Sequence, residues 1–260
     1  MGLTSLILTG CGRQVSQDPS RNPDLLATGP ASRLVPRPFI AASIDAAGGL
    51  PAWTQCRKLD FEAIVTAHHS DGGFYLTEHR FSLYPWSDAI QVTAREPGAP
   101  IVWQLVCGRY TLEGDPNMDV SPLRDSYRQY AEAVLQIVTV PSRLLDKNVV
   151  LARRPVPVQI AGQWYQPIDA QYQPRAAASG DKGSIVEPSW TQGTYFQNQS
   201  TLLVDLVWLG NPLAREFLLV RGYDYARTAN GVLIPTKIEI FHSDREAQFG
   251  PRIALIDLKQ

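Results

Sequence analysis

The chain has 260 residues, of which 44% are hydrophobic, and its 24 basic residues nearly balance its 25 acidic ones. This length suits a single all-β domain with a large core, and no segment is basic enough to form a phosphate-binding surface, so nucleic-acid binding is not expected. No stretch approaches the about 18 consecutive apolar residues of a membrane-spanning helix, so any membrane attachment must use another device.

The N-terminal segment reaches Cys11 through the sequence Leu-Thr-Gly-Cys, which resembles the lipobox of bacterial lipoprotein signal peptides. In that motif an aliphatic residue and two small residues admit the signal peptidase, and the cysteine thiol receives a diacylglycerol. A diacyl lipid buries many CH₂ groups at about 0.8 kcal/mol each, which is enough for lasting anchorage. Residues 1–11 are therefore predicted to be a lipoprotein signal peptide with its lipobox, and Cys11 is predicted to be lipidated.

Two alternatives to lipidation at Cys11 remain. The first is that the lipobox match is fortuitous, because no Lys or Arg precedes Arg13 and the apolar core of the signal peptide is short. A start codon assigned too far downstream would explain both features. Myristoylation at Gly2 is not expected, because position 6 is Leu6 rather than Ser or Thr.

The segment after the cysteine changes character twice. Residues 12–38 are rich in Ser, Asn, Asp, Gln, Gly and Pro with little periodicity, which predicts a flexible tether. Residues 39–50 have the spacing of a short amphipathic helix that Gly48 and Gly49 end, and Trp53 is expected in a linking turn. Residues 39–260 are predicted to form one domain.

Alternating apolar residues then predict strands. In residues 59–67 every odd position is apolar, as in a strand with one buried face. The run Asp71-Gly72-Gly73 predicts a hairpin turn, and further strands are expected at 74–84, 90–96 and 101–106.

A helix interrupts the strands. Ser121 is a candidate N-cap with Pro122 at the first helical position, and apolar residues at helical spacing predict an amphipathic helix over 122–139. Pro141 is expected to interrupt it, with a short helical turn at 142–145. Because helix and strands are segregated along the chain, the helix is expected to lie across one face of an antiparallel sheet.

The second half of the chain is predicted to be almost wholly β. Strands are expected at 156–160, 163–172, 194–197, 202–209, 216–226, 232–242 and 252–258. Asn230-Gly231 is the strongest hairpin signal among them. About ten strands joined by hairpins indicate an incomplete barrel or a strongly curled sheet.

Several segments, taken in chain order, resemble the LolA-like family of envelope proteins. They include the Gly-Gly-Leu-Pro-Ala-Trp run that ends at Trp53, the segments 59–61, 74–78, 84–86, 102–105, 207–209 and 220–223, and the run with Pro-Thr-Lys-Ile at 231–238. The resemblance covers about residues 40–260, with little of it in 141–195. It implies an incomplete antiparallel β-barrel lined by apolar side chains and closed by helices, as in lipid and lipoprotein carriers. No segment matches a partner-docking loop, so lipoprotein transfer is not implied.

Few residues have the spacing that chemistry needs. Cys56 and Cys107 form an even pair once Cys11 is acylated, and the sequence leaves open a disulfide or two buried thiols. His68 and His69 are adjacent on a predicted strand and point to opposite faces, so a polar hairpin end is favoured over a metal site. No nucleophile, phosphate-loop or paired-carboxylate motif is present in usable spacing.

The predicted protein is therefore mainly β, with helices on one face of an incomplete antiparallel β-barrel whose apolar cavity binds lipid or the acyl chain of a lipoprotein. It is expected to be a monomer, tethered to a bacterial membrane through Cys11 and facing the periplasm, with no enzymatic activity, cofactor or metal. One alternative is a structural or interaction lipoprotein with a filled core, and a more distant one is an envelope hydrolase that uses His68 and His69. The candidate lining residues are Phe61, Ala63, Val65, Ile90, Val92, Leu206 and Trp208.

Overall fold

The structure is a computed structural model that describes residues 29, 34–95, 100–106, 109–114, 123, 126–176, 185–186 and 190–259. The predicted signal peptide, Cys11 and most of the predicted tether lie outside these residues. The helices are α1 Pro38–Ala46, α2 Leu50–Gln55, α3 Tyr127–Val138 and α4 Val140–Leu144. The strands are β1 Leu59–His68, β2 Phe74–Tyr84, β3 Ala89–Ala94, β4 Ile101–Val106, β5 Arg109–Glu113, β6 Val149–Arg153, β7 Val158–Ile160, β8 Gln163–Tyr172, β9 Arg175–Ala176, β10 Ile185–Val186, β11 Gln192–Asn198, β12 Val204–Asn211, β13 Glu216–Arg227, β14 Leu233–His242 and β15 Arg252–Leu258.

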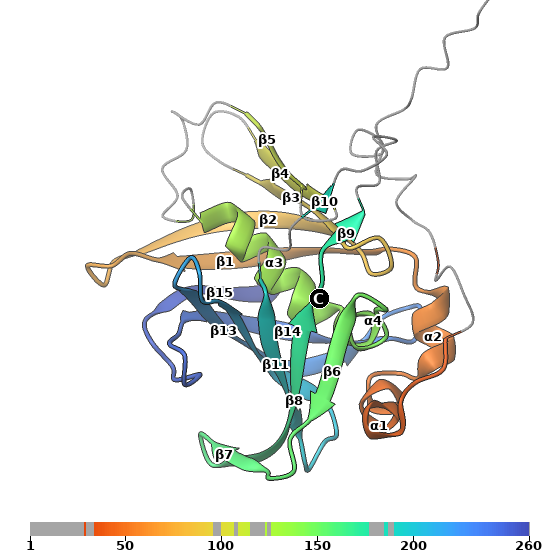
Figure 1. The fold of residues 1–260 in the computed structure, drawn as a ribbon. Helices are drawn as coiled ribbons and strands as arrows, with labels where there is room; N and C mark the ends of the chain where they lie inside the picture. The colour runs from red at the N-terminus through yellow and green to blue at the C-terminus, as the bar shows by residue number, and fades with distance from the viewer. Residues whose placement is uncertain are drawn as a thin grey trace, which may run out of the picture.

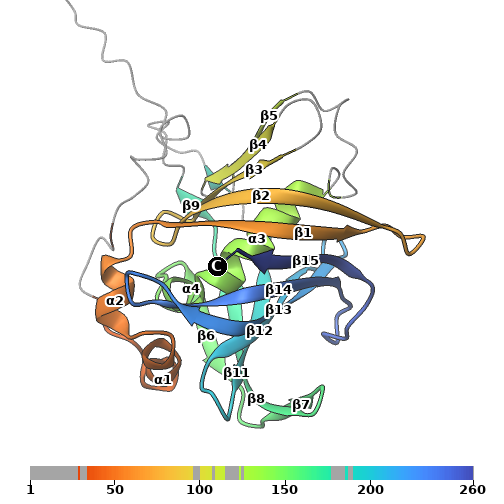
Figure 2. The same ribbon diagram turned by 180° about the vertical axis from the view of Figure 1, so that it is seen from behind.

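One large antiparallel sheet dominates the fold. Its strand order is β5-β4-β3-β2-β1-β15-β14-β13-β12-β11-β8-β6, with β7 paired to β8, and β9 and β10 form a separate ribbon. The sheet is strongly curled, since β1 and β2 run across the view of Figure 1 whereas β6, β8 and β11 run down it, and Figure 2 shows the same curl from behind. The two edges, β5 and β6, do not pair with each other, so the sheet stays open. The predicted fold class, an incomplete antiparallel barrel, is confirmed.

The strand boundaries follow the hydrophobic patterns closely. In β1 the odd-numbered Leu59, Ala63, Val65 and Ala67 are buried, as the alternation predicts. The β1–β2 hairpin turns at the predicted glycines, where Gly72 has a φ of 88° and the Gly73 N–H donates to the Asp71 carboxylate at 2.9 Å. Strands β5 and β6 were not predicted, because each has only five residues and little alternation.

The helical N-terminal segment differs from its prediction. It forms two helices rather than one, and Trp53 lies inside α2 rather than in a linking turn. The break between them fits tightly against the β13–β14 turn, since a Cβ on Gly48 would lie 2.6 Å from the Gly231 carbonyl oxygen. The buried Trp53 ring fixes this corner by donating its N–H to the Ala47 carbonyl at 2.9 Å. The glycine pair therefore ends α1, as predicted, and a second helix begins directly after it at Leu50.

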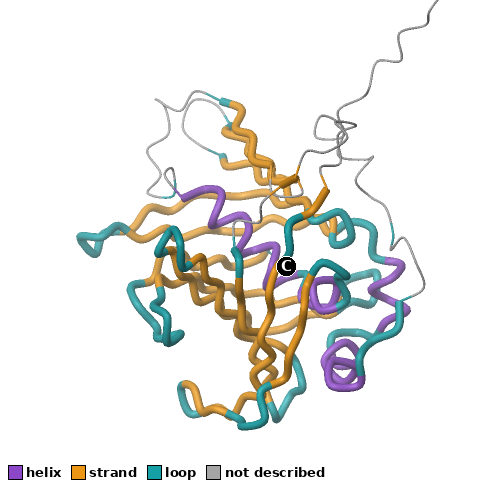
Figure 3. Tube along the Cα trace, in the orientation of Figure 1, coloured by secondary structure: helices purple, strands orange, loops and turns teal. Residues whose placement is uncertain are grey.

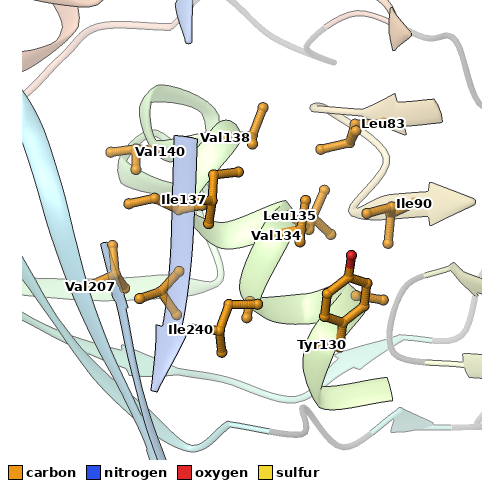
Figure 4. Packing of buried hydrophobic residues seen from close by; sticks show 14 of the residues in the cluster. Leu83, Ile90, Tyr130, Val134, Leu135, Ile137, Val138, Val140, Val207 and Ile240 are labelled. Carbon is orange, nitrogen blue, oxygen red and sulfur yellow. The ribbon is translucent and has the colours of Figure 1, made fainter. Parts of the chain in front are cut away.

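Helix α3 covers the concave face of the sheet, as predicted (Figure 3). Ten of its 12 residues are buried. Figure 4 shows Val134 and Leu135 on the side of Leu83 and Ile90, with Val207 and Ile240 on the other side of the helix. The predicted cap at 121–122 lies outside the described residues. Helix α3 ends at Val138 and the short α4 follows, so the interruption predicted around Pro141 and the helical turn after it are confirmed; Pro141 itself sits in the first turn of α4, where a missing N–H is tolerated.

A second, smaller core lies on the opposite face of the sheet. It consists of Tyr165, Phe196, Leu206, Trp208 and Leu219. The loop at 243–250 covers it, and the Trp208 indole N–H donates to the Asp244 carbonyl at 2.8 Å. Both faces of β12 are therefore buried. Within the described residues, no helix combines the length and the apolar character that crossing a membrane requires.

Candidate ligand-binding site

The seven predicted lining residues do not share one surface. Five of them, Phe61, Ala63, Val65, Ile90 and Val92, belong to or pack against the large core under α3, and the last four are no more than 1% exposed. Leu206 and Trp208 lie on the opposite face, in the smaller core. The space next to the first five is filled by side chains of α3 rather than left open.

An apolar pocket opens instead at one end of the half-barrel, between the start of α3 and strands β13, β14 and β15. We call it the mouth pocket. Its volume is about 320 Å³, which is within the range of small-molecule sites. Its apolar lining is Tyr130, Trp190, Phe217, Leu218, Ile240 and Ile253. Its rim is Ser126, Gln129, Arg215, Glu216, His242 and Ser243.

The sheet opens at this point because of an irregularity between β14 and β15. The pairing register shifts between Ile240 and Phe241, so that Ile240 pairs with Ala254 but Phe241 pairs with Arg252. Ile253 is the extra residue of this bulge, and it packs against the large core from the pocket. The bulge therefore turns a strand residue into part of the pocket wall.

Trp190 supplies an unused polar group to this lining. The residue is 3% exposed, and its indole N–H is buried without a hydrogen-bond partner among the described residues. A buried donor without a partner costs about 1–3 kcal/mol.

A second pocket, which we call the histidine pocket, adjoins the first and shares Ser126, His242 and Ile253 with it. It has a volume of about 830 Å³ and lies between the β1–β2 hairpin and the ends of β14 and β15. Its remaining lining residues are His68, His69, Ser70, Gly72, Phe241, Pro251 and Arg252. The Arg252 Nε–H donates to His68 Nε2 at 3.0 Å, and partial burial and then the Arg252 charge lower the pKa of His68.

His79 lies in the middle of β2, paired with Ala63, rather than at the turn end of the β1–β2 hairpin. Its side chain points into the large core, 2% exposed, with its Nδ1 2.9 Å from the Tyr130 hydroxyl. Its ring packs edge-on against Trp103 at a centroid distance of 5.3 Å. Burial lowers the pKa of His79 to about 3, so the ring is neutral at physiological pH.

The predicted chemical groups are dispersed. No cluster of three or more His, Cys, Asp or Glu side chains among the described residues is arranged to hold a metal ion. Three carboxylates of the sheet have separate partners: Asp205 accepts from Asn198, Asp224 pairs with Lys237 and Glu239 pairs with Arg252. Cys56 is buried, and burial raises the pKa of its thiol to about 11, which disfavours the nucleophilic thiolate. Cys107 lies outside the described residues, so the Cys56–Cys107 disulfide stays a prediction.

The residues of the mouth pocket were missed by the sequence reasoning. Tyr130 falls within the helix predicted over 122–139, and Trp190 lies in none of the predicted elements. Nothing in the spacing of Phe217, Ile240 or Ile253 separates them from ordinary core residues of strands. The alternation of apolar residues in β13 and β14 predicts which face of each strand is buried. It does not predict at which end of the strands the pocket opens.

By its fold the protein is an open antiparallel half-barrel covered by one helix. No protein-family model matches the chain, and no curated protein matches its sequence. Similar solved structures include a LolA superfamily protein from Nitrosomonas europaea, with 11% identity over 87% of this chain and 92% of that chain and a TM-score of 0.47. A DUF1329 family protein from Desulfovibrio piger has 9% identity over 85% and 90%, with a TM-score of 0.46. An outer membrane lipoprotein-sorting protein domain from Vibrio parahaemolyticus has 6% identity over 78% and 83%, with a TM-score of 0.40. The likeness concerns the fold alone.

Proposed function

We propose that the protein is a lipid-binding protein of the bacterial envelope that holds an acyl chain in the mouth pocket. The observation that carries this proposal is the apolar opening of about 320 Å³ under the start of α3. Its wall is made of aromatic and aliphatic side chains from α3 and three strands, while its rim is polar. Small-molecule sites commonly have this composition.

The driving force for binding is the burial of apolar surface, which contributes about 25 cal/mol per Å² removed from water. The side chains that would meet the ligand are already in place, because Tyr130, Leu218 and Ile240 are buried in the protein without it. A pocket that is already formed binds without the cost of ordering its walls.

The proposed setting is a membrane surface. Lipidation at Cys11 would tether the domain through residues 12–38 to a bacterial membrane, on its periplasmic side. The domain would then exchange acyl chains with that membrane, or with a lipoprotein in it, as a monomer. A mass shift of the mature protein that matches a diacylglycerol on Cys11, and its loss in Cys11→Ser, would support the tether.

Ligand binding is tested on protein purified without detergent. Native mass spectrometry should show co-purifying lipid, and the protein should take up a fluorescent fatty acid. Ile253→Trp adds a large ring at the wall of the mouth pocket and should abolish uptake. Overpacking of this kind costs about 1–3 kcal/mol, so the variant should remain folded in a thermal melt.

The matched control is Leu76→Trp, which adds the same ring on the outer face of β2, where Leu76 is 60% exposed. It should take up the probe like the unsubstituted protein. A clean protein mass together with no probe uptake by the unsubstituted protein would contradict the proposal. Equal loss of uptake in both Trp variants would show that the probe does not use the mouth pocket.

One observation favours a second candidate function, a structural or interaction lipoprotein with a filled core. The space between α3 and the sheet is closed by buried side chains, including Val65, Val92 and Val134, each 0% exposed. Under this alternative the mouth pocket stays empty, and the same mass spectrum shows no lipid.

A further inference from the structure

The histidine pocket has an unusual composition for its place beside an apolar site. It gathers three of the four histidines of the chain, His68, His69 and His242, around Arg252. No Asp or Glu is among the described residues that line it. Neutral and cationic hydrogen-bond donors therefore dominate its wall, which suits an anionic oxygen group.

Arg252 is the fixed positive charge of this pocket. One side of its guanidinium is held in place, because Nε donates to His68 at 3.0 Å and Nη1 pairs with the Glu239 carboxylate at 2.9 Å. Its Nη2 donates to none of the described residues. A guanidinium held at Nε and Nη1 in this way keeps the N–H groups of Nη2 for an anionic oxygen.

A second arginine stands on the other side of the shared boundary. Arg215 lies on the rim of the mouth pocket and forms no ion pair with any described residue. Glu216 is the only acidic residue of that rim among the described residues. Each of the two adjoining pockets thus has one arginine in its lining.

We propose that the ligand is a fatty acid, with its hydrocarbon chain in the mouth pocket and its carboxylate in the histidine pocket against Arg252. The two pockets adjoin at Ser126, His242 and Ile253, which line both, so a ligand lying across this boundary would contact both. The mouth pocket has room for a single chain, which favours a single-chain amphiphile over a diacyl lipid. This inference rests on the proposed function and adds the chemical class of the ligand.

The experiment compares lauric acid with lauryl alcohol, which have the same chain and differ in head-group charge. Each is titrated into the full chain, with displacement of a neutral fluorescent acyl probe as the readout. The acid should bind about tenfold more tightly than the alcohol, because a hydrogen bond to a charged group is worth more than a neutral one. Added salt should weaken binding of the acid and leave the alcohol unchanged.

Arg252→Gln should bring the acid down to the affinity of the alcohol without changing the alcohol. Arg252→Lys, which keeps the charge, should restore part of the preference. The control is Arg245→Gln, which removes an exposed arginine of the 243–250 loop that lines neither pocket. It should keep the full preference for the acid.

The outcomes separate this inference from the proposed function. Equal affinity for acid and alcohol in the unsubstituted protein would overturn the fatty-acid assignment, while binding of both would still support an acyl site. The same holds if Arg252→Gln and Arg245→Gln reduce acid binding equally. Binding of neither compound would contradict the proposed function itself, and with it the inference.

Discussion

His79 is a titratable side chain in the middle of the apolar core. Folding removes it from water, and its only described hydrogen bond is between Nδ1 and the Tyr130 hydroxyl. The desolvation lowers its pKa from 6.5 to about 3. In mild acid His79 therefore stays neutral in the folded protein, whereas it is protonated in the unfolded chain.

The resulting prediction concerns stability between about pH 7 and pH 5. As the pH falls below 6.5, the unfolded chain binds a proton at His79 while the folded protein does not until the pH nears 3. The free energy of unfolding should therefore fall, by up to about 1.4 kcal/mol per pH unit from this residue alone. Urea denaturation across this range measures it.

His79→Gln is the control for this effect, because glutamine can still hydrogen-bond Tyr130 but does not titrate. The variant should be less stable at neutral pH, and its stability should fall less on acidification. Parallel pH profiles for the two proteins would show that His79 is not the group responsible. The measurement stays above the range in which most carboxylates titrate.

At the scale of elements, α3 connects the two halves of the curled sheet. Its residues pack against strands β3 and β4 on one side and β12, β13 and β14 on the other. Ile137 is 2% exposed and lies close to Gly222 on β13, where an added Cβ would come 3.1 Å from the Ile137 Cγ1. Because Gly222 has no side chain, the helix can pack closely against β13 at this position.

Ile137→Ala should lower the free energy of unfolding by about 2–5 kcal/mol, since it removes buried methylene groups and leaves a cavity under the helix. Leu213→Ala, at a position that is 93% exposed, should change stability by no more than about 0.5 kcal/mol. Thermal or urea denaturation compares the two. A small effect of Ile137→Ala would mean that α3 is not tightly packed on the sheet.

Element prediction worked best where one face of a strand meets water. The alternation in β1 fixes both its limits and its buried face, and α3 was placed by its apolar spacing. It failed at β12, where Leu206, Val207, Trp208 and Leu209 are all buried. When both faces of a strand are apolar, apolar and polar residues do not alternate, and the sequence does not show which side chains face the large core. Leu206 and Trp208 were therefore assigned to the wrong side of the sheet.

At the scale of the whole molecule, the candidate site is built from segments that are far apart in the chain. The mouth pocket joins the start of α3, Trp190 shortly before β11, and the ends of β13, β14 and β15. The sequence predicted each of these strands and the helix, but their meeting point depends on the curl of the sheet and on the β14–β15 bulge. Neither the curl nor the bulge produces a recognisable pattern in the local sequence. The buried face of each strand could therefore be predicted, but the position of the pocket could not.

The sheet itself is joined by its last strand. β15 pairs with β14 on one side and with β1 on the other, so that Ile256 faces Ile238 and Val65 in the two registers. Without β15, strands β1–β5 and β6–β14 would have no backbone connection within the sheet. The pairing of β1 with β15 brings together the two ends of nearly the whole described domain. Closing so long a loop costs conformational entropy, so this pairing depends on the rest of the fold.

Hydrogen exchange should reflect this arrangement. Amides of β15, β1 and β14 should be among the slowest to exchange, because they are hydrogen-bonded within the centre of the sheet and open only with the whole domain. Amides of the edge strand β5 should exchange faster, since it pairs on one side only and its residues are half-buried or exposed. Deletion of residues 251–260 should abolish cooperative unfolding. Exchange of β15 as fast as that of β5 would indicate that the two halves of the sheet fold as independent units.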